Sequence, residues 1–258
     1  MTDANASPAS IAPPALGVGA LVGDSFRVYG QCFVPATLAT LVPQLFLTLV
    51  SVALLGASVT ADPSTMNPDT VLASSGLLSI LTVVIGGIST AVVTRIVFDT
   101  KTGRTADLGA AVQSALPRLL PIIVLSFAVG VLVVLGFALF IVPGLWLFGV
   151  YAVYAQAIVV EKADWKAMGR SSALTLGYRW PIVGLLLVML LILVAAAVLL
   201  GVISLAFYAL NDLLGVLAET VLGSVPMALF SVAPVLLYAR LCEIKEGRGN
   251  VDLAKVFE

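Results

Sequence analysis

A row of hydroxyl and amide side chains runs along one side of the first long apolar segment. Its members are three, four, four and three residues apart, a spacing that places them on one face of an α-helix: Thr37, Thr40, Gln44, Thr48 and Ser51. Inside a bilayer, such groups either hydrogen-bond to a neighbouring helix or line a route for a polar molecule. The pattern therefore predicts close helix packing or, alternatively, a hydrophilic path for a solute or a lipid headgroup.

The next apolar segment carries a matching row of small and hydroxyl residues on one face: Ser75, Ser79, Thr82, Gly86 and Ser89. A transport relay usually places an ionisable residue near mid-membrane. The only candidate here is Glu219, which the sequence places near the outer end of the last apolar segment. We expect Glu219 to be interfacial, which favours packing over transport.

No pattern in the chain predicts catalysis. The sequence has no histidine, so the common hydrolase arrangements lack their base. Asp99, Glu161 and Glu243 could meet and hold a divalent cation by oxygen, or they could cap helices and pair with basic residues: Arg27, Lys101, Arg170 or Lys245. We expect the second arrangement, and hence no enzyme, no catalytic residue, no metal and no cofactor. Cys32 and Cys242 are expected to be small packing residues.

The composition is that of a membrane protein. Of the 258 residues, 60% are hydrophobic and 10% are charged, whereas soluble domains carry about 25% charged residues. The mean hydropathy is +1.13. The net charge of −1 gives no reason to expect nucleic acid as a partner.

Apolar runs long enough to cross about 30 Å of hydrocarbon recur six times along the chain. We place them at Phe33–Ala57, Ser75–Phe98, Leu119–Val142, Leu145–Val160, Pro181–Ala209 and Leu213–Leu241. Pro143-Gly144 separates the third run from the fourth and predicts a tight hairpin turn between them. The fold class is therefore an all-α, polytopic transmembrane bundle of six spans.

Basic residues predict the orientation of this bundle. All 13 Lys and Arg residues fall in segments, or at helix ends, on one side of the six spans. Positive charge marks the cytoplasmic side, so we expect both termini in the cytoplasm of a bacterial cell and the bundle in its inner membrane. Residues 1–14 are expected to be a disordered tail, 15–245 the transmembrane domain and 246–258 a short cytoplasmic tail.

The spans read as three hairpins of similar design. Each begins after a proline (Pro35, Pro121 or Pro181) and ends with an acid (Asp99, Glu161 or Glu243). A stretch with helical apolar periodicity precedes each hairpin, the clearest being Val18, Val22, Phe26, Tyr29 and Phe33. We expect these to be amphipathic helices in the cytoplasmic headgroup layer; the alternative is connecting helices packed on the end of the bundle.

One segment resembles a known family. It contains Pro143-Gly144-Leu145, Val160-Glu161, Ala167, Arg170-Ser171, Leu174-Thr175, Gly177 and Trp180. This pattern is similar to the glycerophosphoryl diester phosphodiesterase membrane domain family, and the opening Asp24-Ser25-Phe26-Arg27-Val28-Tyr29 resembles the start of that domain. The resemblance covers about residues 16–245. It implies the membrane region without the catalytic barrel that some members carry, because the bundle takes almost the whole length and the chain has no histidine.

The combined hypothesis is a non-enzymatic integral membrane protein that contacts lipids or serves as an anchor or assembly domain. Anionic headgroups are the expected partners of four basic residues: Arg27, Lys166, Arg170 and Arg179. A partner protein stays unidentified. The alternative is a small transporter or channel that uses the polar row from Thr37 to Ser51.

Overall fold

The computed structural model describes residues 15–57, 60, 62, 64, 68–105 and 107–247. Within them the chain is all-α, as predicted. The α-helices are α1 (Val18–Gln31), α2 (Phe33–Leu55), α4 (Pro68–Lys101), α5 (Leu108–Ala115), α6 (Leu119–Leu139), α7 (Ile141–Val150), α8 (Tyr154–Glu161), α9 (Ala167–Thr175), α10 (Arg179–Tyr208) and α11 (Asp212–Glu246). The predicted tail 1–14, the end of the predicted tail 246–258 with Arg248 and Lys255, and the side chain of Ser75 lie outside the described part.

Six helical stretches of the described chain are long and apolar enough to cross a membrane, which confirms the predicted number of spans. They are Phe33–Leu55, Leu78–Lys101, Leu108–Leu139, Ile141–Glu161, Arg179–Tyr208 and Asp212–Glu246. Bulky side chains along them face outward, such as Val42 and Leu191, 60% and 69% exposed. Outward apolar side chains on helices of this length identify a multi-pass integral membrane protein.

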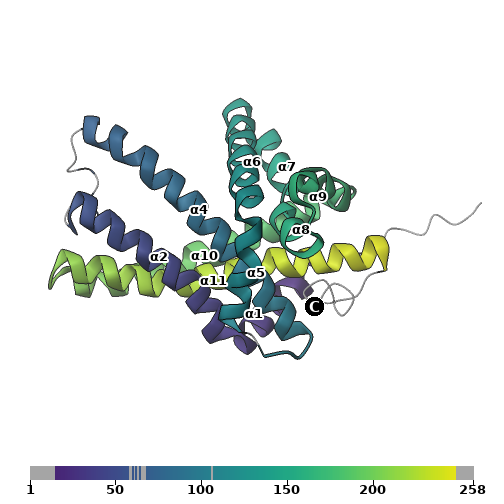
Figure 1. The fold of residues 1–258 in the computed structure, drawn as a ribbon, viewed down its shortest axis with the longest axis horizontal. Helices are drawn as coiled ribbons and strands as arrows, with labels where there is room; N and C mark the ends of the chain where they lie inside the picture. Colours follow the sequence, from purple (N-terminus) through teal and green to yellow (C-terminus); the bar gives the residue numbers. More distant parts are fainter. Residues whose placement is uncertain are drawn as a thin grey trace, which may run out of the picture.

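The six spans form three hairpins that meet at one end. α2 packs with α4, α6 with α7 and α10 with α11, and α11 also packs along α2. In Figure 1 the α6–α7 pair points away from the direction of α11, and α4 lies between the two. Most of the largest fully buried side chains come from α4, α8, α10 and α11, including Phe98, Ile158, Leu185 and Tyr238. The core is therefore concentrated where the hairpins meet.

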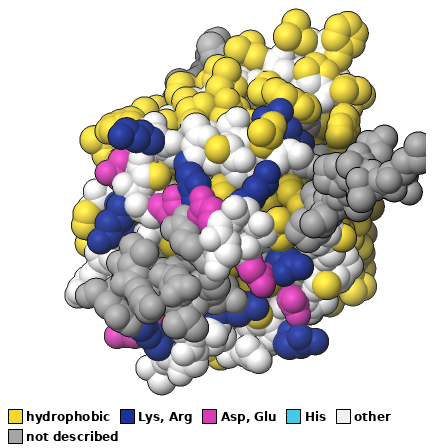
Figure 2. Space-filling model, turned by 90° about the vertical axis from the view of Figure 1, so that its right-hand side faces the viewer, with side chains coloured by type: hydrophobic (Ala, Val, Ile, Leu, Met, Phe, Trp, Pro, Cys, Tyr) yellow, Lys and Arg dark blue, Asp and Glu magenta, His cyan; other side chains and the backbone are white. Residues whose placement is uncertain are grey.

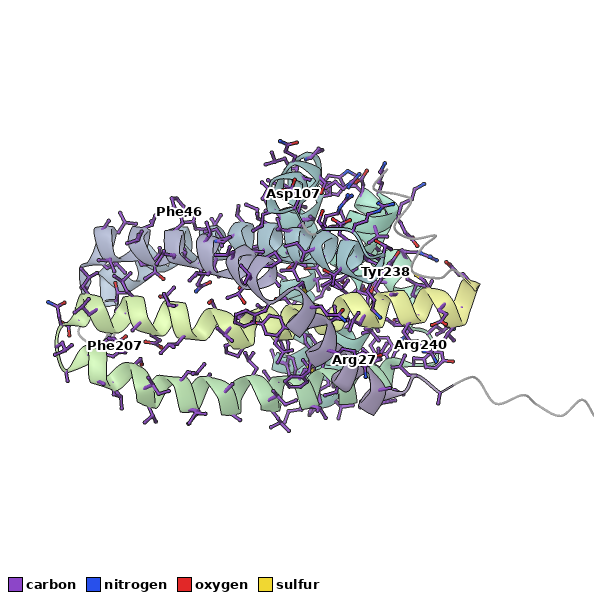
Figure 3. All side chains as sticks on the ribbon, turned by 90° about the horizontal axis from the view of Figure 1, so that it is seen from below. Arg27, Phe46, Asp107, Phe207, Tyr238 and Arg240 are labelled. Carbon is purple, nitrogen blue, oxygen red and sulfur yellow. The ribbon has the colours of Figure 1, made fainter. Side chains whose placement is uncertain are left out.

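Charged side chains gather at this same end, which we call the charged end. Figure 2 views the molecule toward it and shows Lys, Arg, Asp and Glu spread over that face. In Figure 3, Arg27, Asp107 and Arg240 lie toward the charged end, whereas Phe46 and Phe207 lie toward the opposite, hairpin end. The separation agrees with the charge distribution read from the sequence.

The prediction of a turn at Pro143-Gly144 is wrong by a few residues. α6 ends at Leu139, the extended residue Phe140 makes the turn, and Pro143 is the third residue of α7. The first turn of a helix tolerates proline because its N–H groups have no intrahelical acceptor. Gly144 lies against the ring of Phe137, which a Cβ would strike. Pro143 and Gly144 thus lie near the start of the fourth span, and Gly144 lets this span approach the third.

The fourth span is broken near its middle. α7 ends at Val150, three residues follow in turn conformation, and α8 starts at Tyr154. Ser171 of α9 donates a hydrogen bond of 2.8 Å to the Val150 carbonyl. The Thr175 hydroxyl lies 2.9 Å from the Ser171 carbonyl and 3.2 Å from the Val150 carbonyl, so its one hydrogen is shared between them. The backbone N–H of Val153 in turn donates to the Ser171 hydroxyl at 3.4 Å. α9 therefore satisfies backbone groups that the break would leave unpaired.

The predicted apolar stripe from Val18 to Phe33 is only partly buried, since Tyr29 is buried and Val18 and Val22 pack against the core. α1 buries Leu21, Ser25, Val28 and Tyr29, whereas Phe26 and Phe33 of the predicted stripe are 47% and 46% exposed. In α5 the buried residues are alanines, Ala111 and Ala115. Small side chains permit close approach between helices, and the bulkier Val112 of α5 is left 38% exposed.

Candidate intramembrane binding cavity

A cavity of about 740 Å³ lies between the spans and is partly open to its surroundings. Its walls come from α2, α4 and α11, with further contributions from α6, α8 and α10. The converging core residues described above close off the charged end, whereas the cavity extends along the diverging part of the helices. Small-molecule sites commonly have volumes of about 300–1,000 Å³, so this space is large enough for a ligand.

Four of the five residues in the predicted polar row line this cavity: Thr40, Gln44, Thr48 and Ser51. Thr37 does not line it, because its hydroxyl lies 2.8 Å from the hydroxyl of Tyr29. Tyr29 donates onward to the Val225 carbonyl at 3.1 Å, so Thr37 joins α1 and α2 to α11. Further along the row, the Thr40 hydroxyl lies 3.2 Å from the Ser224 carbonyl and the Thr48 hydroxyl 3.0 Å from that of Thr220. The row therefore serves both predicted purposes, since it packs against α11 and also lines the cavity.

The second predicted row also reaches the cavity. Thr82, Gly86 and Ser89 of α4 line it, and Thr90 adds a hydroxyl that the sequence pattern did not include. Gly86 and its neighbour Gly87 differ in their surroundings. A Cβ on Gly86 would meet open space, whereas a Cβ on Gly87 would lie 2.7 Å from the Ile122 side chain of α6. Gly87 thus permits helix contact and Gly86 leaves volume in the cavity.

Most hydroxyls of the wall donate to their own helix. Ser51 donates to Leu47, Thr82 to Leu78, and Thr90 to Gly86, at 2.8–2.9 Å. A hydroxyl that donates in this way keeps its lone pairs for a further partner. The wall therefore presents chiefly hydrogen-bond acceptors to whatever occupies the cavity.

The side-chain amide of Gln44 belongs to the same wall but differs from these hydroxyls in its hydrogen bonding. It has no hydrogen-bond partner within the described part of the chain. An amide at membrane depth is costly to leave unpaired. Its position in the cavity wall gives it access to water or a bound molecule.

Glu219 of α11 lines the cavity, which the expectation of an interfacial role did not include. Tyr208, at the end of α10, donates a hydrogen bond of 2.7 Å to Glu219 Oε2. Gly215 makes this contact possible, since a Cβ there would strike the Tyr208 ring. No separate sequence motif marks the Tyr208–Glu219 pair, because the two residues meet across the turn between α10 and α11.

The break in the fourth span supplies one side of the cavity. Tyr154, the first residue after the break, lines the cavity together with Ser126 of α6, and their hydroxyl oxygens are 2.8 Å apart. Broken membrane helices are tolerated where the freed backbone is satisfied by protein or faces a cavity. Pro143-Gly144 signals irregularity in this span, but nothing in the sequence places the break at residues 151–153.

The four basic residues proposed for lipid contact have different environments at the charged end. Arg27 is 73% exposed at its side chain and pairs with Asp24 at 2.9 Å, and Lys166 is exposed. The Arg179 guanidinium lies 4.5 Å from the centre of the Trp146 ring. Arg170 contacts Glu161 at 2.6 Å and Glu246 at 2.8 Å. Arg170 therefore faces the carboxylates of Glu161 and Glu246 rather than an open surface.

The Arg170 contacts join three helices. The hydrogen bonds that Arg170 donates to Glu246 and Glu161 raise the pKa of its guanidinium above the usual value. Glu161, Cys242 and Glu246 lie close enough to share a cation, and the guanidinium of Arg170 already contacts both carboxylates. Its charge offsets theirs and ties α9 to α8 and α11.

The acids that end the three hairpins have mostly local partners. Of the basic residues expected as partners of these acids, Arg170 pairs with Glu161. Asp99 pairs instead with Arg95 at 2.8 Å, and Glu243 with Arg240 at 2.7 Å, each one turn away in its own helix. Helical spacing of three or four residues brings such pairs together without any tertiary contact. The three acids thus do not form one shared site.

In comparisons with known proteins, no family model, curated protein or solved structure matches the chain. Membership of the glycerophosphoryl diester phosphodiesterase membrane domain family therefore stays a prediction. It depends on the residues from Pro143 to Trp180 and the opening segment.

Proposed function

We propose that this protein binds a small polar or amphiphilic molecule within the membrane and handles it without chemical change, as a transporter or a lipid-handling protein. The observation that supports the proposal is the hydroxyl-lined cavity between α2, α4 and α11. A dry, sealed contact at Gln44 would have removed the motivation for a hydrophilic path. Gln44 instead lies in the cavity wall.

The proposal includes the placement of the chain. We assign it to a bacterial inner membrane with both termini in the cytoplasm, because basic residues concentrate at the charged end. The resemblance to the glycerophosphoryl diester phosphodiesterase membrane domain family supports a lipid-related ligand. The broken fourth span supports a binding site within the membrane, since discontinuous helices commonly form such sites.

A cavity-filling substitution tests this function. In Gly86→Leu the new Cβ meets open space, and the side chain extends from the cavity wall into volume that a ligand would occupy. Gly130→Leu is the matched control, because Gly130 also has open space around its Cβ position but does not line the cavity. Leucine favours a helix over glycine at both positions, so neither variant is expected to unfold.

The measurement is native mass spectrometry of the protein extracted gently from its own membrane. We expect the wild type and Gly130→Leu to retain a molecule of defined mass and Gly86→Leu to lose it. The same retained molecules in all three proteins, or none in any of them, would contradict the proposed function.

A second candidate function is recognition of anionic lipid at the charged end. Two tryptophans there, Trp165 and Trp180, are each 58% exposed and adjoin Lys166 and Arg179 in sequence. Tryptophan and basic side chains together are typical of the membrane interface. Anionic headgroups are the ligands that such a surface would attract.

The test uses exposed residues only. The double variant Arg27→Gln/Lys166→Gln should lose bound phosphatidylglycerol in native mass spectra. Lys101→Gln/Lys162→Gln, which removes equal charge from two other exposed lysines of the same end, should keep it. Equal retention of phosphatidylglycerol by both variants would contradict the second candidate function. These basic residues would then serve only to orient the protein in the membrane.

A further inference from the structure

The cavity has an uncompensated negative charge. Glu219 is the charged residue among those that line the cavity, and no Lys or Arg is found in that lining within the described part of the chain. Glu219 lies seven residues from the start of α11, which at 1.5 Å per residue is about 10 Å along the helix. The side chain of Glu219 is exposed, so its carboxylate is accessible to a molecule that enters the partly open cavity.

One oxygen of Glu219 is held and the other is available. Tyr208 donates to Oε2, a charge-assisted hydrogen bond that orients the carboxylate. Within the described residues, Oε1 has no hydrogen-bond or ion-pair partner. The Tyr208 ring is itself fixed by its contact with Gly215. The carboxylate is thus preorganised toward the cavity rather than engaged by a basic side chain.

The rest of the wall suits the same kind of ligand. Ser51, Thr82 and Thr90 direct their hydrogens into their own helices and leave lone pairs toward the cavity. Acceptors on the wall and a carboxylate near one end favour a ligand with positive charge or with N–H donors. A phosphate or carboxylate ligand would find few donors and a repelling charge.

We propose that the cavity takes a molecule bearing a protonated amine or a quaternary ammonium group, whose charge lies against Glu219. This inference rests on the proposed function, because it names the chemical class of the ligand in the same cavity. The group can belong to a zwitterionic lipid headgroup or to a free organic amine. Both share the ammonium chemistry that Glu219 recognises.

A pair of thiol reagents of opposite charge tests the sign of the cavity. A Gln44→Cys variant in nanodiscs is labelled with trimethylammonium-ethyl or with sulfonato-ethyl methanethiosulfonate, and each rate is divided by that for a free thiol. The native Cys32 and Cys242 are buried, so the wild type gives the background. Val42→Cys is the control on the same helix, since Val42 is exposed but does not line the cavity.

We expect the cationic reagent to label Gln44→Cys about tenfold faster than the anionic one, because a charged cleft concentrates ions of opposite sign. Adding Glu219→Gln should bring the ratio close to one, and Glu219→Asp should recover part of it. Equal rates for the two reagents, or a ratio unchanged by Glu219→Gln, would overturn the cationic ligand and leave the binding cavity standing. No labelling by either reagent would remove both the cavity and the ligand.

Protection from labelling identifies the source of the ammonium group. The Gln44→Cys variant is prepared in phosphatidylglycerol nanodiscs, in the same nanodiscs with phosphatidylethanolamine, and with tetraethylammonium chloride. Slower labelling with phosphatidylethanolamine supports a lipid headgroup, and slower labelling with tetraethylammonium supports a soluble organic amine. Protection by neither would contradict the inference.

Discussion

The hydroxyl of Ser171 in α9 donates a 2.8 Å hydrogen bond to the carbonyl of Val150, the residue at which the fourth span breaks. Both residues are buried. Thr175, one turn further along α9, shares its hydroxyl hydrogen between the same oxygen at 3.2 Å and the Ser171 carbonyl at 2.9 Å. The two hydroxyls stabilise a discontinuity that places Tyr154 in the cavity wall. They also give a structural role to Ser171 and Thr175, which belong to the segment from Pro143 to Trp180 that resembles the membrane domain family.

Removal of both hydroxyls should destabilise the protein more than the sum of the single changes. In Ser171→Ala or Thr175→Val alone, the other hydroxyl still reaches the Val150 carbonyl. In the double variant that buried carbonyl is left unpaired, which costs about 1–3 kcal/mol. Unfolding in mixed detergent micelles measures the difference. Ser172→Ala is the control, and simple additivity would mean that the two hydroxyls do not share this role.

Adjacent glycines in α4 should respond in opposite ways to alanine. Gly87→Ala places a Cβ 2.7 Å from Ile122, so we expect a loss of about 1–3 kcal/mol in the free energy of unfolding. Gly86→Ala meets open space and should be neutral or slightly stabilising. Thermal unfolding of the purified protein distinguishes them; equal stability of the two variants would contradict the described contact between α4 and α6.

Arg170 should matter for stability, and Arg27 should not. Arg170 contacts two carboxylates and is 23% exposed, so Arg170→Gln should cost about 1.5–3 kcal/mol, the range for hydrogen bonds to charged groups. The Arg27–Asp24 pair is exposed and should contribute about 0–1 kcal/mol. Arg170→Lys should recover little, since lysine lacks the planar fork. A similar loss in Arg27→Gln would contradict this ranking.

The sequence predicts the membrane fold well because each span needs only length and apolar composition. The number of spans and their pairing into three hairpins agree with the structure. Helical periodicity also identifies one wall of the cavity, since residues three and four apart must share a face. Thr40, Gln44 and Thr48 were predicted on that basis and do line the cavity.

The features that the sequence does not predict depend on contacts between helices. The separation of hairpins that opens the cavity depends on contacts such as Gly87 with Ile122, which no single segment encodes. The Tyr208–Glu219 pair forms only when α10 and α11 turn back on each other. Hydropathy also does not show that Tyr29 of the predicted stripe is buried while Phe26 is exposed, because it does not separate a bulky side chain facing lipid from one facing protein.

The most direct test of the account is a structure of the wild type and of Gly86→Leu in lipid nanodiscs. We predict density that is not protein between α2, α4 and α11, bounded by Gln44 and Glu219, in the wild type, and its loss in Gly86→Leu. α2 and α4 closed tightly against α11, with Gln44 hydrogen-bonded to a neighbouring helix and no space between them, would contradict the proposed binding cavity.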